Sequence, residues 1–311
     1  MRRIVRITAA FALGALSLTP PAFAQQAQAG APPADPVELV KEARKLNSEG
    51  RQDAALALYK QALQRAPDSF DAHFGAGVAL DLQGRYKDAR QHFSKAIELA
   101  GEGNRNQALT AMAASYAFES DAKGASRFLR QAFDREMESG DLTGAAETAN
   151  ALGRIYLECG SFDDAFKWYQ TGYETSRRQP NLPADQVDLW DMRWAHAQAR
   201  IAARRGDASE ARRQTAAVQS LLDKGTNPDQ KIQYPYLAGY VDLYLKDYKA
   251  AIADLEAADQ KDPFILALLA QAYEKSGDAA KARELYVQVL ASNAHSVNNA
   301  FARPLARKKV H

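Results

Sequence analysis

Residues 70–103 read FDAHFGAGVALDLQGRYKDARQHFSKAIELAGEG, and this stretch contains the pattern that decides the fold. Gly84 divides it in two, with Gly77 seven residues before this glycine and Ala89 five residues after it. Glycine ends a helix at little steric cost because it adopts the left-handed backbone conformation readily. The stretch therefore predicts two antiparallel helices joined by a tight turn, with their backbones close together at Gly77 and Ala89.

The same spacing recurs along the chain, which indicates an internal repeat. The seven turn positions are Gly50, Gly84, Ser120, Gly160, Gly206, Lys246 and Gly277. Seven residues before them stand the small residues Ala43, Gly77, Ala113, Gly153, Ala199, Gly239 and Ala270. Five residues after them stand Ala55, Ala89, Ala125, Ala165, Ala211, Ala251 and Ala282. Each predicted helix pair still has an apolar face that only a neighbouring pair can cover, so the pairs are expected to stack.

This pattern resembles the tetratricopeptide repeat, whose signature combines small residues, aromatic residues, alanine and a closing proline. The matching residues of the clearest copy are Gly77, Leu80, Gly84, Tyr86, Ala89, Phe93 and Ala96. The resemblance covers residues 36–296 and implies an all-α fold, a right-handed α-α superhelix (solenoid) of about seven helix pairs. It leaves the function open, because such repeats serve many unrelated partners.

The repeat lengthens in the middle of the chain. Ala165 and Ala211 lie 46 residues apart (211 − 165), whereas Ala55 and Ala89 lie 34 apart (89 − 55). We expect longer helices or loops there, and the two prolines of residues 178–185 predict the longest loop. Asp185 is expected to cap the helix that follows it.

Residues 1–24 have the layout of a secretory signal peptide. They contain three arginines, then an apolar run, and end in Ala22-Phe23-Ala24, which predicts cleavage after Ala24. The apolar run is too short for a membrane anchor, and a mitochondrial presequence remains an alternative. The predicted protein is exported, periplasmic or secreted, without stable membrane insertion after cleavage. Residues 25–35 predict a disordered lead, and residues 297–311 a basic C-terminal tail or cap.

Composition excludes several classes of protein. Without residues 1–24 the chain has 37 basic residues (40 − 3) against 38 acidic ones, so nothing predicts nucleic-acid binding. Cys159 is the single cysteine, which excludes an internal disulfide and a cysteine-rich metal site. We expect it to be a small, half-buried helix residue.

Catalytic motifs such as GxSxG, HExxH and the P-loop are absent from the sequence. The five histidines are scattered along the sequence, and no nucleophile, base and orienting group are recognisable together. We therefore predict no catalytic, cofactor-binding or metal-binding residues, and a binding scaffold instead of an enzyme.

The resemblance implies that the first helix of each pair lines a concave groove. Carried over by register, the partner-binding residues are Asn150, Arg154, Arg193, His196, Arg200, Arg204, Tyr236, Tyr240 and Tyr244. The groove would be basic in units four and five and aromatic in unit six. Since arginine and tyrosine are enriched at interface hot spots, we expect an acidic, partly apolar protein or peptide segment as partner.

Other interpretations of these residues remain open. The arginines are equally typical of a solvated basic helix face, and Trp190 and Trp194 are expected to be buried. Asn150, Arg154, Arg193 and Arg200 resemble the carboxylate-clamp subclass of the repeat in part, but its lysine and second asparagine are not found in register.

The sequence thus predicts an exported scaffold that binds a protein or peptide segment in its concave groove. One alternative is a structural component or assembly factor of an envelope complex that acts through its ends. The other is a carbohydrate-binding solenoid whose tyrosine and tryptophan faces hold sugars.

Overall fold

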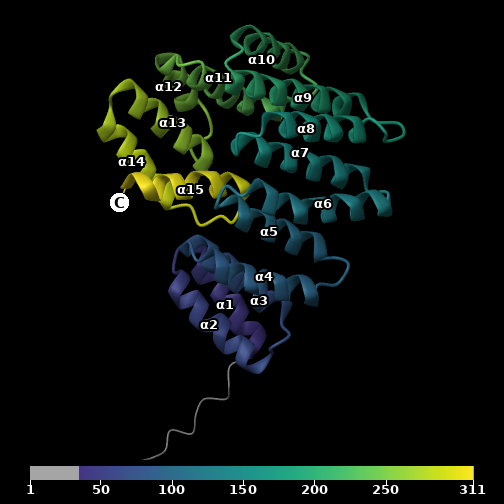
Figure 1. Cartoon of the computed structure of the whole chain (residues 1–311), viewed down its shortest axis with the longest axis vertical. Helices are drawn as coiled ribbons and strands as arrows, with labels where there is room; N and C mark the ends of the chain where they lie inside the picture. The colour runs from purple at the N-terminus through teal and green to yellow at the C-terminus, as the bar shows by residue number, and fades with distance from the viewer. Residues whose placement is uncertain (1–34, 311) are drawn as a thin grey trace, which may run out of the picture. The chain divides into compact units, whose positions relative to one another are not determined.

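The computed structural model describes residues 35–310, and over this range the chain forms helices with short connections and no β-strand (Figure 1). The predicted signal peptide and residues 25–34 of the predicted lead lie outside the described residues. Asp35, which we expected to belong to that lead, is instead the N-cap of the first helix. Its Oδ1 accepts a hydrogen bond from the backbone amide of Val37 at 2.9 Å.

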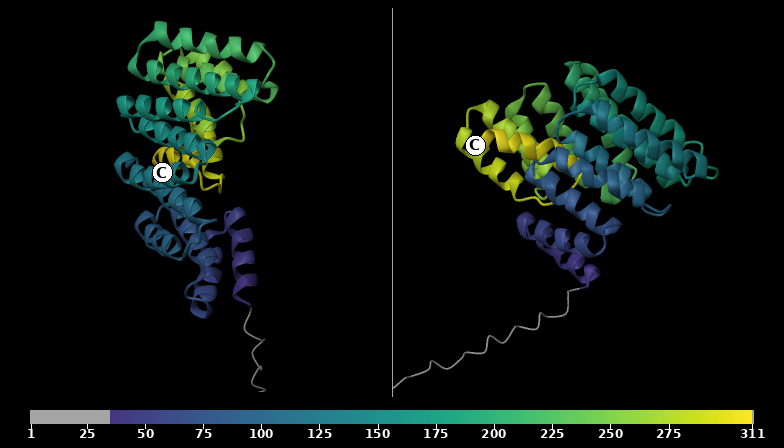
Figure 2. Two further views of the ribbon diagram at one scale, coloured as in Figure 1. Left: turned by 90° about the vertical axis from the view of Figure 1, so that its right-hand side faces the viewer. Right: turned by 60° about the horizontal axis from the view of Figure 1, so that its bottom comes forward.

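Fourteen of the described helices form seven consecutive pairs, as the repeat predicts. They are α1 (Pro36–Ser48) with α2 (Gln52–Arg65), α3 (Phe70–Gln83) with α4 (Tyr86–Leu99), α5 (Arg105–Ala117) with α6 (Ala122–Ser139), α7 (Leu142–Glu158) with α8 (Phe162–Ser176), α9 (Ala184–Arg205) with α10 (Ala208–Asp223), α11 (Gln233–Tyr244) with α12 (Tyr248–Ala257), and α13 (Pro263–Ser276) with α14 (Ala279–Leu290). A short 3-10 helix, η1 (Pro228–Ile232), precedes α11, and α15 (Val297–Val310) follows the last pair. Each pair packs on the next (Figure 2), so the predicted all-α solenoid is confirmed.

The turns within the pairs have one conformation. All seven predicted turn residues have a positive φ, including Ser120 (57°) and Lys246 (70°), which carry side chains. A residue other than glycine pays roughly 1 kcal/mol for this conformation, so the geometry of the pair is kept even where the sequence does not favour it.

The helices of a pair approach closely at the small residues. A Cβ atom added to Gly77 would lie 2.7 Å from a ring carbon of Phe93, and one added to Gly153 would lie 2.7 Å from the ring of Tyr169. The repeat alanines, Ala89 among them, are fully or almost fully buried. The predicted contact between the small residue, the alanine and the large residue beside them is therefore confirmed.

Helix α9 shows how the middle units are lengthened, because it runs for 22 residues. The predicted cap at Asp185 is wrong. The helix begins at Ala184, two residues earlier than a cap at Asp185 would place it, because Pro183, whose ring fixes φ, takes the N-cap position. No side chain caps the helix. Asp185 lies in the first turn, where its negative charge interacts favourably with the positive end of the helix dipole.

The C-terminal segment that we predicted as a tail or cap is helix α15, and it does more than cover the last pair. It contacts α13 and α14 and also α5 and α7, so it lies against the first helices of several units (Figure 1). The guanidinium of Arg303 donates from Nε to the carbonyl of Leu82 at 3.0 Å and from Nη1 to the carbonyl of Leu290 at 2.8 Å.

Residues just before α15 also bind the first units. The Gln52 side chain donates to Asn293 Oδ1 at 3.0 Å, and His295 Nε2 lies 2.8 Å from the buried carboxylate of Asp81. The C-terminal segment therefore joins the first and last repeats.

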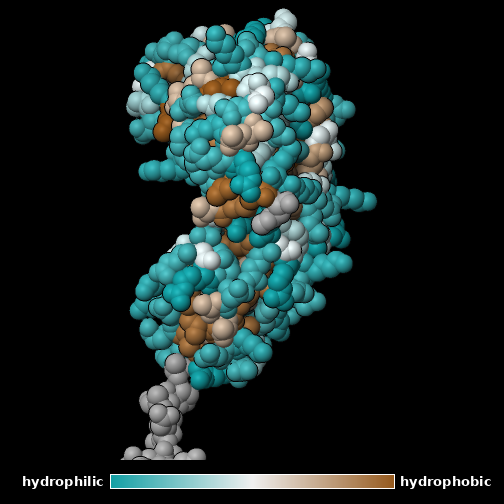
Figure 3. All heavy atoms as spheres, turned by 90° about the vertical axis from the view of Figure 1, so that its left-hand side faces the viewer, coloured by the Kyte–Doolittle hydropathy of each residue, from teal (hydrophilic) through white to brown (hydrophobic). Residues whose placement is uncertain are grey.

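The surface is mainly polar on the side that carries α14 and the end of α15, where hydrophobic residues form separate small areas (Figure 3). None of the helices within residues 35–310 has the length and apolar character that a membrane span needs.

Candidate functional site

The first helices of units four to seven line two hollows, which we name the arginine pocket and the α15 pocket. The arginine pocket has a volume of about 420 Å³ and lies between α7 and α9, with η1, α11 and the start of α15 at its edge. The predicted binding residues that line it are Asn150, Arg154, Arg193, His196 and Arg200. The arginine pocket thus brings together five of the nine residues predicted from the register.

The α15 pocket is larger, about 720 Å³, and lies between α15, the first helices α7, α9, α11 and α13, and the turns that follow α3 and α5. Of the predicted residues, Arg204 and Tyr244 line it. Tyr236 and Tyr240 line neither pocket.

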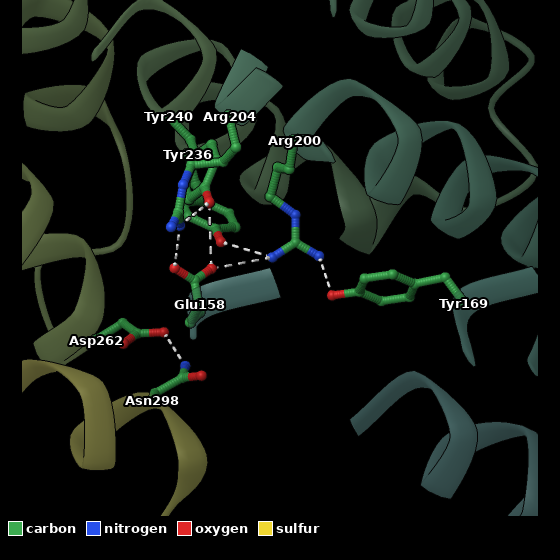
Figure 4. A network of polar contacts seen from close by, with 8 residues as sticks. All are labelled: Glu158, Tyr169, Arg200, Arg204, Tyr236, Tyr240, Asp262 and Asn298. Carbon is green, nitrogen blue, oxygen red and sulfur yellow. Dashed lines mark hydrogen bonds and ion pairs between the residues drawn. The ribbon is translucent and has the colours of Figure 1, made fainter. Parts of the chain in front are cut away.

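Glu158, which the sequence analysis missed, organises the polar residues between the pockets (Figure 4). Its side chain is only 5% exposed. Its carboxylate accepts a hydrogen bond from Arg204 Nη1 at 3.1 Å and one from the hydroxyl of Tyr240 at 3.3 Å. Arg200 Nη1 lies 4.0 Å from the same carboxylate. Side chains of units four, five and six therefore meet around a single glutamate.

Arg200 makes its hydrogen bonds to tyrosines. Its Nη2 donates to the hydroxyl of Tyr169 at 2.7 Å and its Nη1 to the hydroxyl of Tyr236 at 3.3 Å. Arg200, Tyr236 and Tyr240 are buried, with exposed fractions of 4%, 5% and 0%. The first helices lie so close that these side chains contact one another across the groove.

Two sequence-based interpretations change as a result. The prediction that Tyr236 and Tyr240 present contact area to a partner is wrong, because both are core residues. Arg200 lines the arginine pocket, although its side chain is only 5% exposed. The alternative of a solvated basic face is also wrong for Arg200 and Arg204, since the latter's side chain is 15% exposed and bound to Glu158.

Arg154 differs from the other groove arginines. It makes no hydrogen bond or ion pair with any residue between 35 and 310, and its Nε and Nη2 are buried. Its guanidinium lies 4.6 Å from the ring centroid of Phe264 in α13. The charge is therefore held against an aromatic face, with donors left unused.

His196 is the groove histidine. Burial, together with the positive charges of Arg200 and Arg154, lowers the pKa of its imidazole well below the usual value. The ring is neutral at pH 7 and can donate one hydrogen bond and accept another.

Arg193 is held at the edge of the arginine pocket by an ion pair with Glu147. Its guanidinium lies 4.8 Å from the ring centroid of Trp190, which is buried as predicted. Trp194 is partly buried and stacks on Tyr173 with 5.9 Å between ring centroids.

The sequence contained a signal for Glu158. Asn150, Arg154 and Glu158 follow one another at steps of four along α7, so the register that selected the first two residues also selects the third.

Two parts of the chain, residues 41–104 and residues 265–295, match family models described as tetratricopeptide repeat. The matches fall on the helix pairs that the structure contains. The chain is a tetratricopeptide repeat protein. No curated protein sequence matches it.

Solved structures similar to this tetratricopeptide repeat protein include a tetratricopeptide repeat protein from Parabacteroides merdae, at 13% identity and a TM-score of 0.50, with 89% of this chain and 99% of that chain covered. RapI in its apo form matches at 10% identity and a TM-score of 0.53, over 88% and 98% of the two chains. Aspartyl phosphate phosphatase F from Bacillus subtilis matches at 12% identity and a TM-score of 0.53, over 82% and 67%. Likeness at these identities shows the fold alone. The fold supports a general role as a scaffold for protein–protein interaction.

Proposed function

We propose that this protein is an exported interaction scaffold that binds an acidic, partly apolar protein segment in the α15 pocket. The observation that carries the proposal is the composition of that pocket. Its volume of about 720 Å³ lies within the range of about 300–1,000 Å³ that is typical of ligand sites. Phe301 and Leu305 of α15 line it and are only partly buried, so apolar area is available to a partner.

Charge in the α15 pocket favours an acidic segment. Arg204 is paired with Glu158, and Glu119 with Arg90, so these lining charges are balanced within the chain. Arg307 and the exposed Lys308 add positive charge. A partner that carries carboxylates beside apolar side chains complements both features.

We propose binding without catalysis. In support, the groove carboxylate of Glu158 is engaged by Arg204 and Tyr240. His196 makes no hydrogen bond to a nucleophile or carboxylate of the described residues, so it lacks the orienting partner that a general base needs.

Export rests on the composition of residues 1–24. N-terminal sequencing of the native protein is expected to begin at Gln25, after the Ala-x-Ala end. An intact Met1 on protein from the cytosolic fraction would contradict export without affecting the proposal for the α15 pocket.

Binding is tested by capturing partners from an envelope fraction with the purified protein and measuring the affinity of the captured segment. We expect Lys308→Glu to weaken binding severalfold, and the loss to shrink as salt screens the charges over about 10 Å at 0.1 M. The control is Lys275→Glu, an exposed lysine of α13 outside both pockets, which should leave the affinity unchanged.

Equal affinities for wild type and Lys308→Glu at every salt concentration would remove the α15 pocket as the site. Loss of capture on Val37→Asp, an exposed residue of α1, would instead favour assembly through the ends. Trimming residues 297–311 does not make this distinction, because α15 lies in the groove. Glycan binding without any captured protein would favour the carbohydrate-binding alternative.

A further inference from the structure

The guanidinium of Arg154 has donors that no group of the described chain accepts. Nε and Nη2 are buried without a hydrogen-bond partner, and the guanidinium carbon lies 4.6 Å from the centroid of the Phe264 ring, a cation–π contact that provides no hydrogen-bond acceptor atom. A buried cation without an acceptor costs several kcal/mol in general. The position of this cation at the arginine pocket indicates that the acceptor comes from outside the described residues.

A second arginine adds to the same charge. Arg200 lines the pocket with Arg154, and its Nε also lacks a partner among residues 35–310. The Nη1 and Nη2 groups of Arg200 donate to neutral tyrosine hydroxyls. The carboxylate of Glu158 lies closer to Arg204, at 3.1 Å, than to Arg200, at 4.0 Å. The lining of the arginine pocket thus holds the guanidinium groups of Arg154, Arg193 and Arg200 and the carboxylate of Glu147, which is paired with Arg193. Positive charge is left in a hollow with low-dielectric walls, which strengthen electrostatic fields.

Unused amides complete the polar lining. Asn150, Gln230 and Gln233 line the pocket, and within the described residues none of the three uses its side chain in a hydrogen bond. A carboxamide both donates and accepts, which suits hydroxyl groups. The neutral ring of His196 adds one more donor and acceptor.

The remaining wall is apolar and the space is small. Ala151, Met192 and Val297 contribute aliphatic surface. The volume of about 420 Å³ lies near the lower end of the range of about 300–1,000 Å³ for small-molecule sites. A compact ligand fills such a space, whereas one acidic side chain of a docked protein fills only part of it.

We propose that the arginine pocket binds a small hydroxylated organic acid. The carboxylate or phosphate of the ligand lies on Arg154 and Arg200, and its hydroxyl groups bond the amides of Asn150, Gln230 and Gln233. Guanidinium groups bind both kinds of anion through paired N–H donors. The site is separate from the α15 pocket, so it does not depend on the protein segment proposed to bind there.

The test uses the purified protein and three probes: glucuronate for the carboxylate, glucose 6-phosphate for the phosphate, and uncharged glucose. Calorimetric titration and thermal melting measure binding. At least one of the two acids is expected to bind saturably with one site per chain and to raise the melting temperature, and glucose is expected to do neither. The acid that binds more tightly identifies the anion.

The variant Arg154→Met separates a binding role from a structural one. It should weaken acid binding at least tenfold, because the unpaired donors are lost. Without the buried unpaired charge, the unliganded variant should melt at or above the wild-type temperature. The control is Arg177→Met, since this arginine pairs with Asp191 and lines neither pocket; acid binding should persist in it.

Three outcomes overturn the proposal: no saturable binding of either acid to the wild type, binding that survives Arg154→Met, or a melting temperature of unliganded Arg154→Met well below that of the wild type. The last outcome would mean that Arg154 is a structural residue. Failure of the protein-binding proposal is seen separately, with Lys308→Glu and the captured segment.

Discussion

Replacing Glu158 with glutamine should destabilise the units around α7, although the substitution changes neither the size of the side chain nor its position. It removes the carboxylate that lies 3.1 Å from Arg204 and 4.0 Å from Arg200. The glutamine can still accept a hydrogen bond from Tyr240, so the effect reports the lost charge.

The magnitude follows from burial. Removing one partner of a buried ion pair costs about 3–5 kcal/mol, because the other charge remains buried and unpaired. The side chain of Glu158 is 5% exposed and that of Arg204 15%, and the α15 pocket beside them admits solvent. We therefore expect the lower end, a loss of about 3 kcal/mol in the free energy of unfolding.

The assay is urea unfolding followed by circular dichroism, with hydrogen exchange to locate the weakened helices. The matched control is Glu147→Gln, the same substitution on the same helix, whose partner Arg193 is at the surface. The side chains of that pair are 50% and 33% exposed, so the loss should stay below about 1 kcal/mol. Equal losses for the two variants, or weakened exchange protection far from α7, α9 and α11, would refute the view that Glu158 holds the groove together.

Three further predictions concern the fold. Ala89→Leu should cost about 1–3 kcal/mol of stability through overpacking, whereas Lys87→Leu at an exposed position should stay within about 0.5 kcal/mol; equal melting temperatures would contradict the close contact. Arg303→Met should lower stability by about 2 kcal/mol, because the Leu290 carbonyl loses its side-chain donor and the Leu82 carbonyl keeps only that of Arg307. Hydrogen exchange that is unchanged in both α3 and α14 would argue against that role. Burial raises the pKa of the Cys159 thiol to about 11, so alkylation of the native protein should be slow at neutral pH, accelerate as the pH approaches 11, and be fast at neutral pH in urea; equal rates in native and unfolded protein would contradict burial.

The position of α15 decides which part of the groove a partner can reach. Its residues Ala300, Ala302 and Ala306 are buried against the solenoid, so α15 is an integral part of the fold. The arginine pocket and the α15 pocket remain open beside it, and they differ in size, lining and charge.

Sequence alone determined the repeat, because each part of the pattern acts over a short distance. The turn at Gly84 requires a residue that adopts the left-handed backbone conformation. Gly77 and Ala89 must be small because the two helix backbones approach each other there. Ser120 and Lys246 were assigned to turns despite their side chains because the small residues around them keep the spacing. These requirements are met within a single helix pair, so the order of residues along the chain suffices to predict them.

Tertiary structure alone decided how the groove residues are used. The register placed Arg200, Tyr236 and Tyr240 on first helices, but whether they face solvent depends on how closely units four, five and six approach. Tyr240 and Glu158 are 82 residues apart, and Arg303 lies 221 residues from its acceptor Leu82. Such contacts depend on how several successive units stack on one another. The spacing of residues within one helix pair does not determine that stacking. For the same reason the sequence predicted that α15 is basic, while only the folded chain showed that it lies in the groove.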